Sequence, residues 1–145
     1  STAHRVLDGT KSVRLSKTGR KQNAFVLSDS RESVLYSATH INHPSAVWVR
    51  QNDQNYWWLY NLWTELMDEY TYRYDKHHAC ERLKDTLRYA PENIPEGLFT
   101  EPTPAMPDNY KVAGDSIQSY KNYYLGDKTR MFSWKKRNRP IWITK

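Results

Sequence analysis

HPSAVWVRQNDQNYWWLYNLWTELMDEYTYRYDK, the segment from His43 to Lys76, contains four of the six tryptophans in this chain of 145 residues. Within it, large apolar residues recur at intervals of three and four, which is the spacing of one face of an α-helix. The residues of this stripe are Tyr56, Leu59, Trp63, Leu66 or Met67, Tyr70 and Tyr74. The spacing predicts a long central helix that buries the stripe.

Polar residues define the start and the outer face of this central helix. Asn52 or Asp53 precedes the stripe, and either side chain can accept hydrogen bonds from the unpaired N–H groups of a first helical turn. Glu69 and Arg73 stand four residues apart, the spacing of an ion pair on a helix surface. The helix is therefore expected to have one side in water.

Three rings of the central helix, those of Trp57, Trp58 and Tyr60, lie outside the stripe. Large apolar side chains gathered on a surface mark an interaction site. We therefore expect either that other elements cover the helix on several sides or that it presents aromatic rings to a partner. Self-association is one such partnership.

Shorter helices are predicted before and after the central one, from apolar spacing, capping residues and terminating glycines or prolines. Gly9 is expected to end the first helix in the left-handed conformation. Gly126 is expected to end the helix that Asp115 caps. The predicted ranges are 1–9, 31–40, 45–50, 77–89, 115–125 and 127–134.

Three segments lack a helical pattern. Residues 10–23 are polar and basic, which predicts a hairpin-like or mobile loop, although no alternation typical of a strand is visible anywhere in the chain. Residues 91–107 hold five of the seven prolines and predict an extended segment that crosses the surface, anchored by apolar residues such as Ile94 and Leu98. Residues 135–145 form a basic C-terminal tail.

Length and composition favour one domain. A chain of 145 residues with 38% hydrophobic content is the size of one ordinary core, so we predict a compact, mainly α-helical single domain over residues 1–145. No run of 18 apolar residues and no apolar signal-peptide core is present, which predicts a soluble, unexported protein away from the membrane. The single cysteine, Cys80, excludes an internal disulfide and fits a reducing compartment.

The net charge of +6 is unevenly distributed. Residues 1–31 carry seven basic and two acidic residues, and residues 127–145 carry seven basic residues and one acidic residue. The segment between them is acidic, with eight basic and thirteen acidic residues. If the two basic ends converge in space, they form a cationic surface that attracts a polyanion such as nucleic acid. The alternative is that both ends are solvated tails.

Aromatic and basic residues interleave from Tyr120 onward. Rings stack on exposed or flipped bases and cations contact phosphates, so this mixture is typical of proteins that bind distorted or single-stranded DNA or RNA. Alternatively, these tyrosines form the buried face of their helix. The candidate nucleic-acid contacts are Lys17, Arg20, Lys21, Arg50, Tyr120, Lys121, Tyr123, Tyr124, Lys128, Arg130, Lys135, Lys136 and Arg137.

Histidine and cysteine, both ligands of zinc, occur in two groups. His40 and His43 stand three residues apart, and His77, His78 and Cys80 lie close together. One thiol and no CxxC pair match no zinc signature, so we predict no metal site. No cofactor is predicted either, because Walker and dinucleotide-binding patterns are absent.

Two carboxylates of the central helix, Glu65 and Glu69, are candidates for general acid–base catalysis. They stand one turn apart, and burial or a neighbouring like charge raises the pKa of a carboxyl group. The alternative is that they belong to the solvated face of the helix. No hydrolase or zincin motif accompanies them.

Several short runs together resemble a group of uncharacterised phage-type proteins. That group is distantly similar to the phage pyrimidine-dimer DNA glycosylase (endonuclease V) family, most visibly through SYKNYYLGDK and IPEG. The likeness to the group covers nearly the whole chain, and the likeness to the glycosylase covers the C-terminal third. The runs are HPSAVWVR, NYWWLY, EYTYRY, IPEG, AMPDNYKV and SYKNYYLGDKTR with a following tryptophan.

The resemblance implies a compact helical fold, a DNA-repair activity and a location in the cytoplasm of a phage-infected bacterium. In the glycosylase family an N-terminal amine attacks the sugar carbon of the damaged nucleotide, forms a Schiff base and leads to strand cleavage, with help from a carboxylate. Ser1 is the residue here that can expose such an amine. In the phage-type group a segment with a strand and a helix precedes STAHRVLDG, so we expect the active-site segment, with its glutamate, to be shortened or missing here.

These observations predict a nucleic-acid-binding protein of phage type, with DNA as the expected ligand and RNA as the alternative, related to DNA glycosylases with AP-lyase activity. The alternative is a non-enzymatic phage or virion protein that binds another protein through its aromatic surface.

Overall fold

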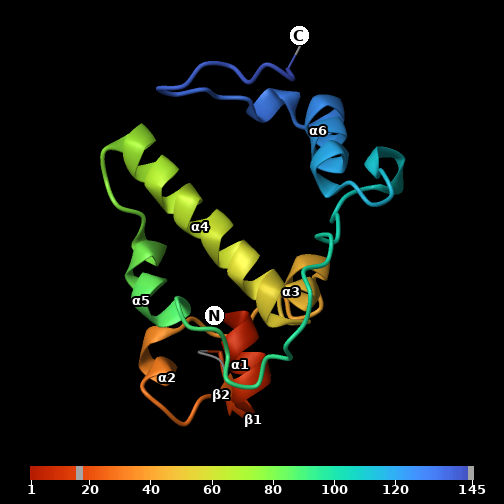
Figure 1. The fold of residues 1–145 in the computed structure, drawn as a ribbon. Coiled ribbons are helices and arrows are strands. Elements are labelled where there is room, and N and C mark those ends of the chain that lie inside the picture. Colours follow the sequence, from red (N-terminus) through yellow and green to blue (C-terminus); the bar gives the residue numbers. More distant parts are fainter. Residues whose placement is uncertain (16–17, 144–145) are drawn as a thin grey trace.

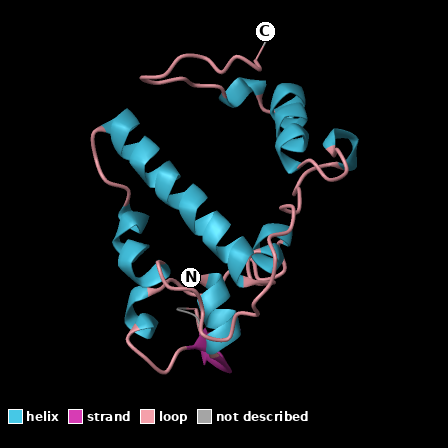
Figure 2. Ribbon diagram, viewed as in Figure 1, coloured by secondary structure: helices cyan, strands magenta, loops and turns pink. Residues whose placement is uncertain are grey.

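Helices dominate the computed structural model, which describes residues 1–15 and 18–143 (Figures 1 and 2). The predicted mainly α-helical class is confirmed. Within the described residues, the β structure is one two-stranded antiparallel sheet. In chain order the elements are α1 (Thr2–Asp8), β1 (Thr10–Leu15), β2 (Lys21–Val26), α2 (Arg31–Val34), α3 (Pro44–Trp48), α4 (Asp53–Tyr74), the 3-10 helix η1 (Ala79–Leu83), α5 (Lys84–Leu87), η2 (Asp108–Tyr110), α6 (Ser116–Asp127) and η3 (Thr129–Met131).

α4 is the central helix that the sequence predicts, and it spans 22 residues. Asn52 is its N-cap, because the Asn52 side chain accepts a hydrogen bond from the Asn55 amide at 2.9 Å. On the predicted stripe, Tyr56 and Met67 are buried, whereas Leu66 is 59% exposed. Met67 therefore continues the buried face of α4, and Leu66 lies on its exposed side.

Two clusters of buried apolar side chains lie around the N-terminal half of α4. The first joins α1, α3 and α4, and the second joins the ends of β2 and α2 to η1. Both pack against partly buried aromatic rings of α4, which explains why this helix is so rich in tryptophan and tyrosine. The members are Ala3, Trp48, Val49 and Tyr56 in the first cluster, and Leu27, Leu35 and Leu83 in the second.

β1 and β2 form an antiparallel hairpin in which Thr10 lies opposite Val26. The hairpin-like alternative for residues 10–23 is therefore correct, although the sequence shows no alternation typical of a strand there. Nearly every residue of β1 is exposed, so no buried face imposes the alternation of apolar and polar residues that reveals a strand. Residues 16 and 17, and with them the candidate contact Lys17, lie outside the described residues.

The helix predicted over residues 31–40 is much shorter in the structure. α2 ends at Val34, and Leu35 adopts an extended conformation. The guanidinium of Arg5 donates hydrogen bonds to the carbonyls of Glu32 and Leu35, so the chain binds α1 here instead of continuing the helix.

At Gly9 and Gly126, neighbouring atoms leave no room for a side chain, and neither glycine has the left-handed conformation that the sequence predicts for Gly9. Gly9 ends α1 with a φ of −88°, and a Cβ there would lie 2.4 Å from the carbonyl oxygen of Arg5. Gly126 lies inside α6, where a Cβ would lie 2.4 Å from the ring of Tyr110. In both places a larger residue would have to displace a close neighbour.

Most of the chain that follows α4 is irregular. Residues 77–89, predicted as one helix, divide into η1 and α5, and η3 is the regular part of residues 127–134. Residues 91–107 run extended without a helix or strand, as predicted. Their anchor Ile94 packs against the first cluster, whereas Leu98 is 87% exposed. Within the described residues, no helix has the length and apolar character that a bilayer crossing requires.

The guanidinium of Arg5 ties α1 to the segment from β2 to the end of α2. The side chain is 4% exposed and forms an ion pair of 2.5 Å with the carboxylate of Glu32. It also donates to four backbone carbonyls, which would be deprived of their partner without it. The acceptors are Phe25 at 3.0 Å, Glu32 at 3.0 Å, Leu35 at 2.7 Å and Tyr36 at 2.6 Å.

Replacing Arg5 by methionine is expected to lower the free energy of unfolding by about 3–5 kcal/mol, because four carbonyls and a carboxylate lose their partner. The matched control is Arg14→Met, since Arg14 pairs with the same carboxylate from a more exposed position. That variant is expected to cost at most about 1 kcal/mol. Urea denaturation followed by circular dichroism measures both, and equal losses would contradict the structural role of Arg5.

His4 is 1% exposed and forms part of a buried hydrogen-bond chain. Its Nδ1 accepts from Arg31 at 3.1 Å, so its Nε2 carries the proton and donates to the Tyr56 hydroxyl at 2.8 Å. That hydroxyl donates in turn to the carbonyl of Leu87 at 2.7 Å. Burial, followed by the positive charges of the Ser1 amine and Arg31, lowers the pKa of His4 from 6.5 to about 4.

Stability is therefore expected to fall as the pH drops from about 6.5 to about 4, because the unfolded chain binds a proton at His4 that the folded chain excludes. The loss is on the order of 3 kcal/mol. Urea denaturation of the protein and of His4→Gln, at pH 7 and at about pH 4.5, isolates this contribution, with the exposed His77→Gln as control. An unchanged pH dependence in His4→Gln would refute it.

Candidate functional site

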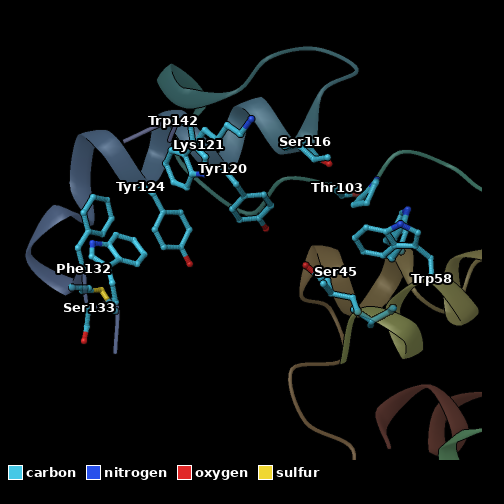
Figure 3. Close-up of a pocket in the computed structure, with 17 residues that line it drawn as sticks. Ser45, Trp58, Thr103, Ser116, Tyr120, Lys121, Tyr124, Phe132, Ser133 and Trp142 are labelled. Carbon is cyan, nitrogen blue, oxygen red and sulfur yellow. The ribbon is translucent and has the colours of Figure 1, made fainter. Parts of the chain in front are cut away.

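An apolar groove of about 600 Å³ lies between the N-terminal half of α4 and the chain from α6 to the C-terminus (Figure 3). One wall comes from α3 and α4, and the other comes from α6, η3 and the residues that follow. Among the residues that line it, Lys121 is the one with a charge. The lining residues are Ser45, Trp48, Trp58, Leu59, Leu62, Pro102, Thr103, Ser116, Ile117, Tyr120, Lys121, Tyr124, Met131, Phe132, Ser133, Trp134 and Trp142.

The wall on α4 presents a tryptophan whose orientation is set by its neighbours. The Trp58 ring packs edge-on against Trp48 at 5.6 Å between centroids and lies 6.0 Å from Phe99. It remains 39% exposed, and Leu62, one turn later, is 51% exposed. This face of α4 therefore offers a flat ring and an apolar side chain to the groove.

The opposite wall carries tyrosines from one face of α6 and rings from the segment after η3. Figure 3 shows Tyr120 and Tyr124 projecting from α6 into the space that separates them from Trp58. Tyr124 is 44% exposed. Phe132 and Trp134 lie 5.2 Å apart in a tilted pair beside them. Aromatic rings thus face the groove from both sides.

The distance between the walls depends on a buried hydrogen-bond cluster at Asn55. Asn55 is completely buried. Its side-chain amide donates to the Trp48 carbonyl at 3.1 Å and to the Thr100 hydroxyl at 2.9 Å. Its amide oxygen accepts from the Thr100 amide at 2.9 Å. The Trp48 indole also donates to the Thr100 carbonyl at 3.1 Å. These bonds clamp the proline-rich segment onto α4, and α6 follows from there.

The structure brings three of the predicted nucleic-acid contacts into the groove, namely Tyr120, Lys121 and Tyr124. Tyr123 instead packs on Tyr110, with ring centroids 5.4 Å apart, and the Lys128 ammonium lies 5.0 Å from the Tyr123 ring. The alternative of a purely buried tyrosine face is therefore wrong for Tyr124, which is exposed to the groove. Arg130, next to the lining residue Met131, is exposed.

The last three candidate cations fold back onto the C-terminal end of α4. Lys136 forms an ion pair with Asp75, Arg137 forms one with Glu69, and the Lys135 ammonium lies 4.8 Å from the ring of Tyr74. The basic tail is therefore partly neutralised within the chain and is not simply a solvated tail.

Three further candidates lie away from the groove. Arg20 and Lys21 belong to the hairpin, which Figure 1 places at the opposite end of the molecule from α6 and the C-terminus. Arg50 donates to the carbonyls of Ile41 and Ala46, both at 2.7 Å, which is a structural role. The two basic ends of the chain consequently do not converge on one surface.

The carboxylate candidates differ in their surroundings. Glu65 is exposed on α4. Glu69 forms the predicted ion pair with Arg73, with 2.6 Å between Nε and Oε1, as well as the pair with Arg137. Hydrogen bonds from Arg137 and Arg73 lower the pKa of Glu69 to about 2, so this carboxylate is ionised at neutral pH and has no proton to donate.

Ser1 lies at a second cavity, of about 720 Å³, between α1, α3, α4 and α5. Burial, and secondarily the charge of Arg5, lowers the pKa of its amine to about 6. His40, His43 and Cys80 also border this cavity.

The histidine side chains form local hydrogen bonds. Nδ1 of His43 accepts from the Ser45 amide at 3.2 Å, and Nδ1 of His78 accepts from the Cys80 amide at 3.1 Å. Nδ1 of His77, which precedes η1, forms a hydrogen bond of 2.8 Å with the carboxylate of Glu81. Across residues 1–15 and 18–143, no three acidic, histidine or cysteine side chains converge as a metal site would require.

The sequence reasoning missed the α4 wall and the C-terminal rings as parts of one site. The available signal for the α4 wall is that Trp58 falls outside the buried stripe and that Leu62 follows it at four-residue spacing, which places both side chains on one exposed face of the helix. Nothing local indicates that Phe132, Trp134 and Trp142 would face them, because these residues are at least 70 positions away in the chain.

Comparison of this chain with models of protein families, with curated proteins and with solved structures finds no match.

Proposed function

We propose that this protein binds single-stranded or locally unpaired nucleic acid, with bases in the aromatic groove. The observation that carries the proposal is the pair of facing walls, with Trp58 on one side and Tyr120 and Tyr124 on the other, in an apolar groove of about 600 Å³. Every base has a π-face that stacks on such rings, whatever its identity. The face of a base is accessible in this way only where the strand is unpaired.

Cations on the α6 side supply the contacts to phosphate in this proposal. Lys121 lines the groove, Lys128 is the C-cap of α6, and Arg130 lies in η3 beside the lining residue Met131. A strand that stacks bases between the walls would bring its backbone past these residues. Each contact between a cation and a phosphate increases the affinity of the protein for the strand. The resemblance to DNA glycosylases favours DNA over RNA, and the cytoplasm of a phage-infected bacterium as the place of action.

The proposal also treats residues 1–145 as one compact domain, because the groove uses residues from both halves of the chain. In that case circular dichroism and tryptophan fluorescence will report a single unfolding transition at one denaturant concentration.

Tyr124→Ala is expected to weaken binding of a short oligothymidylate by about 1–3 kcal/mol, because one stacking platform is lost. The matched control is Tyr89→Ala, which removes a ring that is 65% exposed and lies outside the groove. Fluorescence anisotropy of a labelled oligonucleotide measures both affinities. If the two variants bind equally well, the groove is not where bases stack.

Binding is also expected to weaken as salt rises, with a slope of log affinity against log salt of about −0.7 for each phosphate contacted. Lys121→Gln should remove one phosphate contact and so reduce the magnitude of that slope by about 0.7. Lys11→Gln makes the same change of charge in the hairpin and should leave the slope as it was. An absence of any DNA or RNA binding at low salt would refute the proposed function and favour the alternative, a phage or virion protein whose aromatic surface binds another protein.

A second candidate function is glycosylase and AP-lyase chemistry, and it depends on Ser1. In a protein whose N-terminus is Ser1, an amine with a pKa of about 6 is mostly uncharged at neutral pH, the form that attacks a sugar carbon. Borohydride reduction in the presence of abasic or dimer-containing DNA would trap that adduct. Binding without a trapped adduct would leave a binding module alone.

A further inference from the structure

The segment after η3 connects two parts of the molecule that are far apart in sequence. It leaves α6, crosses to the C-terminal end of α4 and then turns back (Figure 1). Its first residues, Phe132, Ser133 and Trp134, line the aromatic groove. Whatever holds this segment against α4 therefore also sets the position of one groove wall.

A set of charged and aromatic contacts, which we call the C-terminal latch, holds it there. Arg137 donates to both carboxylate oxygens of Glu69, with the shortest distance at 2.6 Å, and its guanidinium lies 4.1 Å from the ring centroid of Tyr72. Lys136 donates to Asp75 at 2.5 Å and to the Tyr72 carbonyl at 3.0 Å. These contacts join residues that are more than 60 positions apart.

Two backbone contacts complete the latch. The Tyr72 hydroxyl donates to the Lys136 carbonyl at 3.1 Å, and Arg73 donates to the Ser133 carbonyl at 3.3 Å. Asp75 and Lys136 both have positive φ, at 53° and 59°, so the chain bends sharply on each side of their ion pair. The carboxylates of Glu69 and Asp75 and the ring of Tyr72, all at the C-terminal end of α4, thus hold a wall of the groove through Lys136 and Arg137.

We propose that the C-terminal latch is an electrostatic closure of the aromatic groove, which a polyanion opens by competing with Glu69 and Asp75 for Arg137 and Lys136. The proposal rests on the proposed function for its natural ligand, a nucleic-acid strand. The carboxylates are 28% and 78% exposed, and ion pairs at such positions are individually weak and sensitive to salt. Phosphates present the same chemistry as the carboxylates that they replace, and they bind arginine in the same two-point manner.

The competition couples binding to groove shape. In the closed state Glu69 and Asp75 neutralise two cations next to the groove, so an incoming strand meets fewer positive charges. Once a phosphate binds Arg137 or Lys136 in place of the carboxylate, the segment from Phe132 to Arg137 is free to move away from α4. This movement widens the opening of the aromatic groove. Removing the two carboxylates should therefore strengthen polyanion binding beyond the effect of the charge change alone.

The test compares Glu69→Gln combined with Asp75→Asn against Glu65→Gln combined with Asp68→Asn, which removes the same charge from exposed positions of the same helix. Asparagine tolerates the left-handed conformation of Asp75, so the first variant keeps the backbone bend. Circular dichroism establishes that both are folded. Tyr72→Phe is a third variant, which removes one latch hydrogen bond without any change of charge.

The latch is measured first without any ligand, as the rate of trypsin cleavage after Lys135, Lys136 and Arg137. The double latch variant should be cleaved severalfold faster than the wild type and the control, and Tyr72→Phe should lie between them. Rising salt should accelerate cleavage of the wild type and leave the double latch variant almost unaffected. Equal cleavage rates in all proteins would overturn the proposal.

Binding is then measured with inorganic polyphosphate, a polyanion without bases, and with a short oligothymidylate. Both are expected to bind the double latch variant roughly three- to thirtyfold more tightly than the control, the range for two exposed ion pairs. If polyphosphate binds the double latch variant more tightly than the control but the oligothymidylate binds neither, the latch is supported and the proposed nucleic-acid function is refuted. If polyphosphate binds the latch variant and the control equally, or binds neither, competition for the latch is refuted whatever the oligonucleotide does.

Discussion

The buried side chain of Asn55 is the constraint on which the rest of the structure depends. A primary amide without partners is costly to bury, and here its N–H groups and its oxygen are taken by Trp48 and Thr100. Because Thr100 lies in the middle of the proline-rich segment, this cluster determines where that segment leaves α4. Each proline fixes its own φ and restricts the residue before it, so the path to α6 is stiff. The cluster thus holds in place the segment that leads to α6, from which the second groove wall begins.

The two ends of α4 hold the second half of the chain by different physical means. At the N-terminal end, neutral hydrogen bonds are buried around Asn55, where water cannot compete. At the C-terminal end, Glu69 and Asp75 bind Arg137 and Lys136 at an exposed surface, where each pair contributes at most about 1 kcal/mol. The groove therefore has one permanent anchor and one that ions can displace. This asymmetry is what allows a wall lined by rings to move while the fold persists.

Local sequence was enough to predict α4, to narrow its cap to Asn52 or Asp53 and to predict its surface pair of Glu69 with Arg73, because each depends on residues within four positions. Among the candidates that it singled out, Tyr120 and Tyr124 line the groove in the structure. Local sequence could not predict that α2 is short, because α2 ends where the distant side chain of Arg5 donates to the carbonyls of Glu32 and Leu35. It also could not predict the hairpin, because an exposed strand has no periodic pattern of apolar residues. The basic tail looked available for phosphate because its partners on α4 are more than 60 residues away.

Photocrosslinking with an oligonucleotide that carries 5-iodouracil tests the central claim most directly, since this base reacts efficiently only with a ring on which it stacks. Mass spectrometry of the adducts locates the stacked residue. The structure predicts adducts at Trp58, Tyr120 or Tyr124, on the two facing walls of the groove. Adducts confined to exposed rings outside the groove, such as Tyr36 or Tyr89, or the absence of any adduct under conditions of saturated binding, would contradict it.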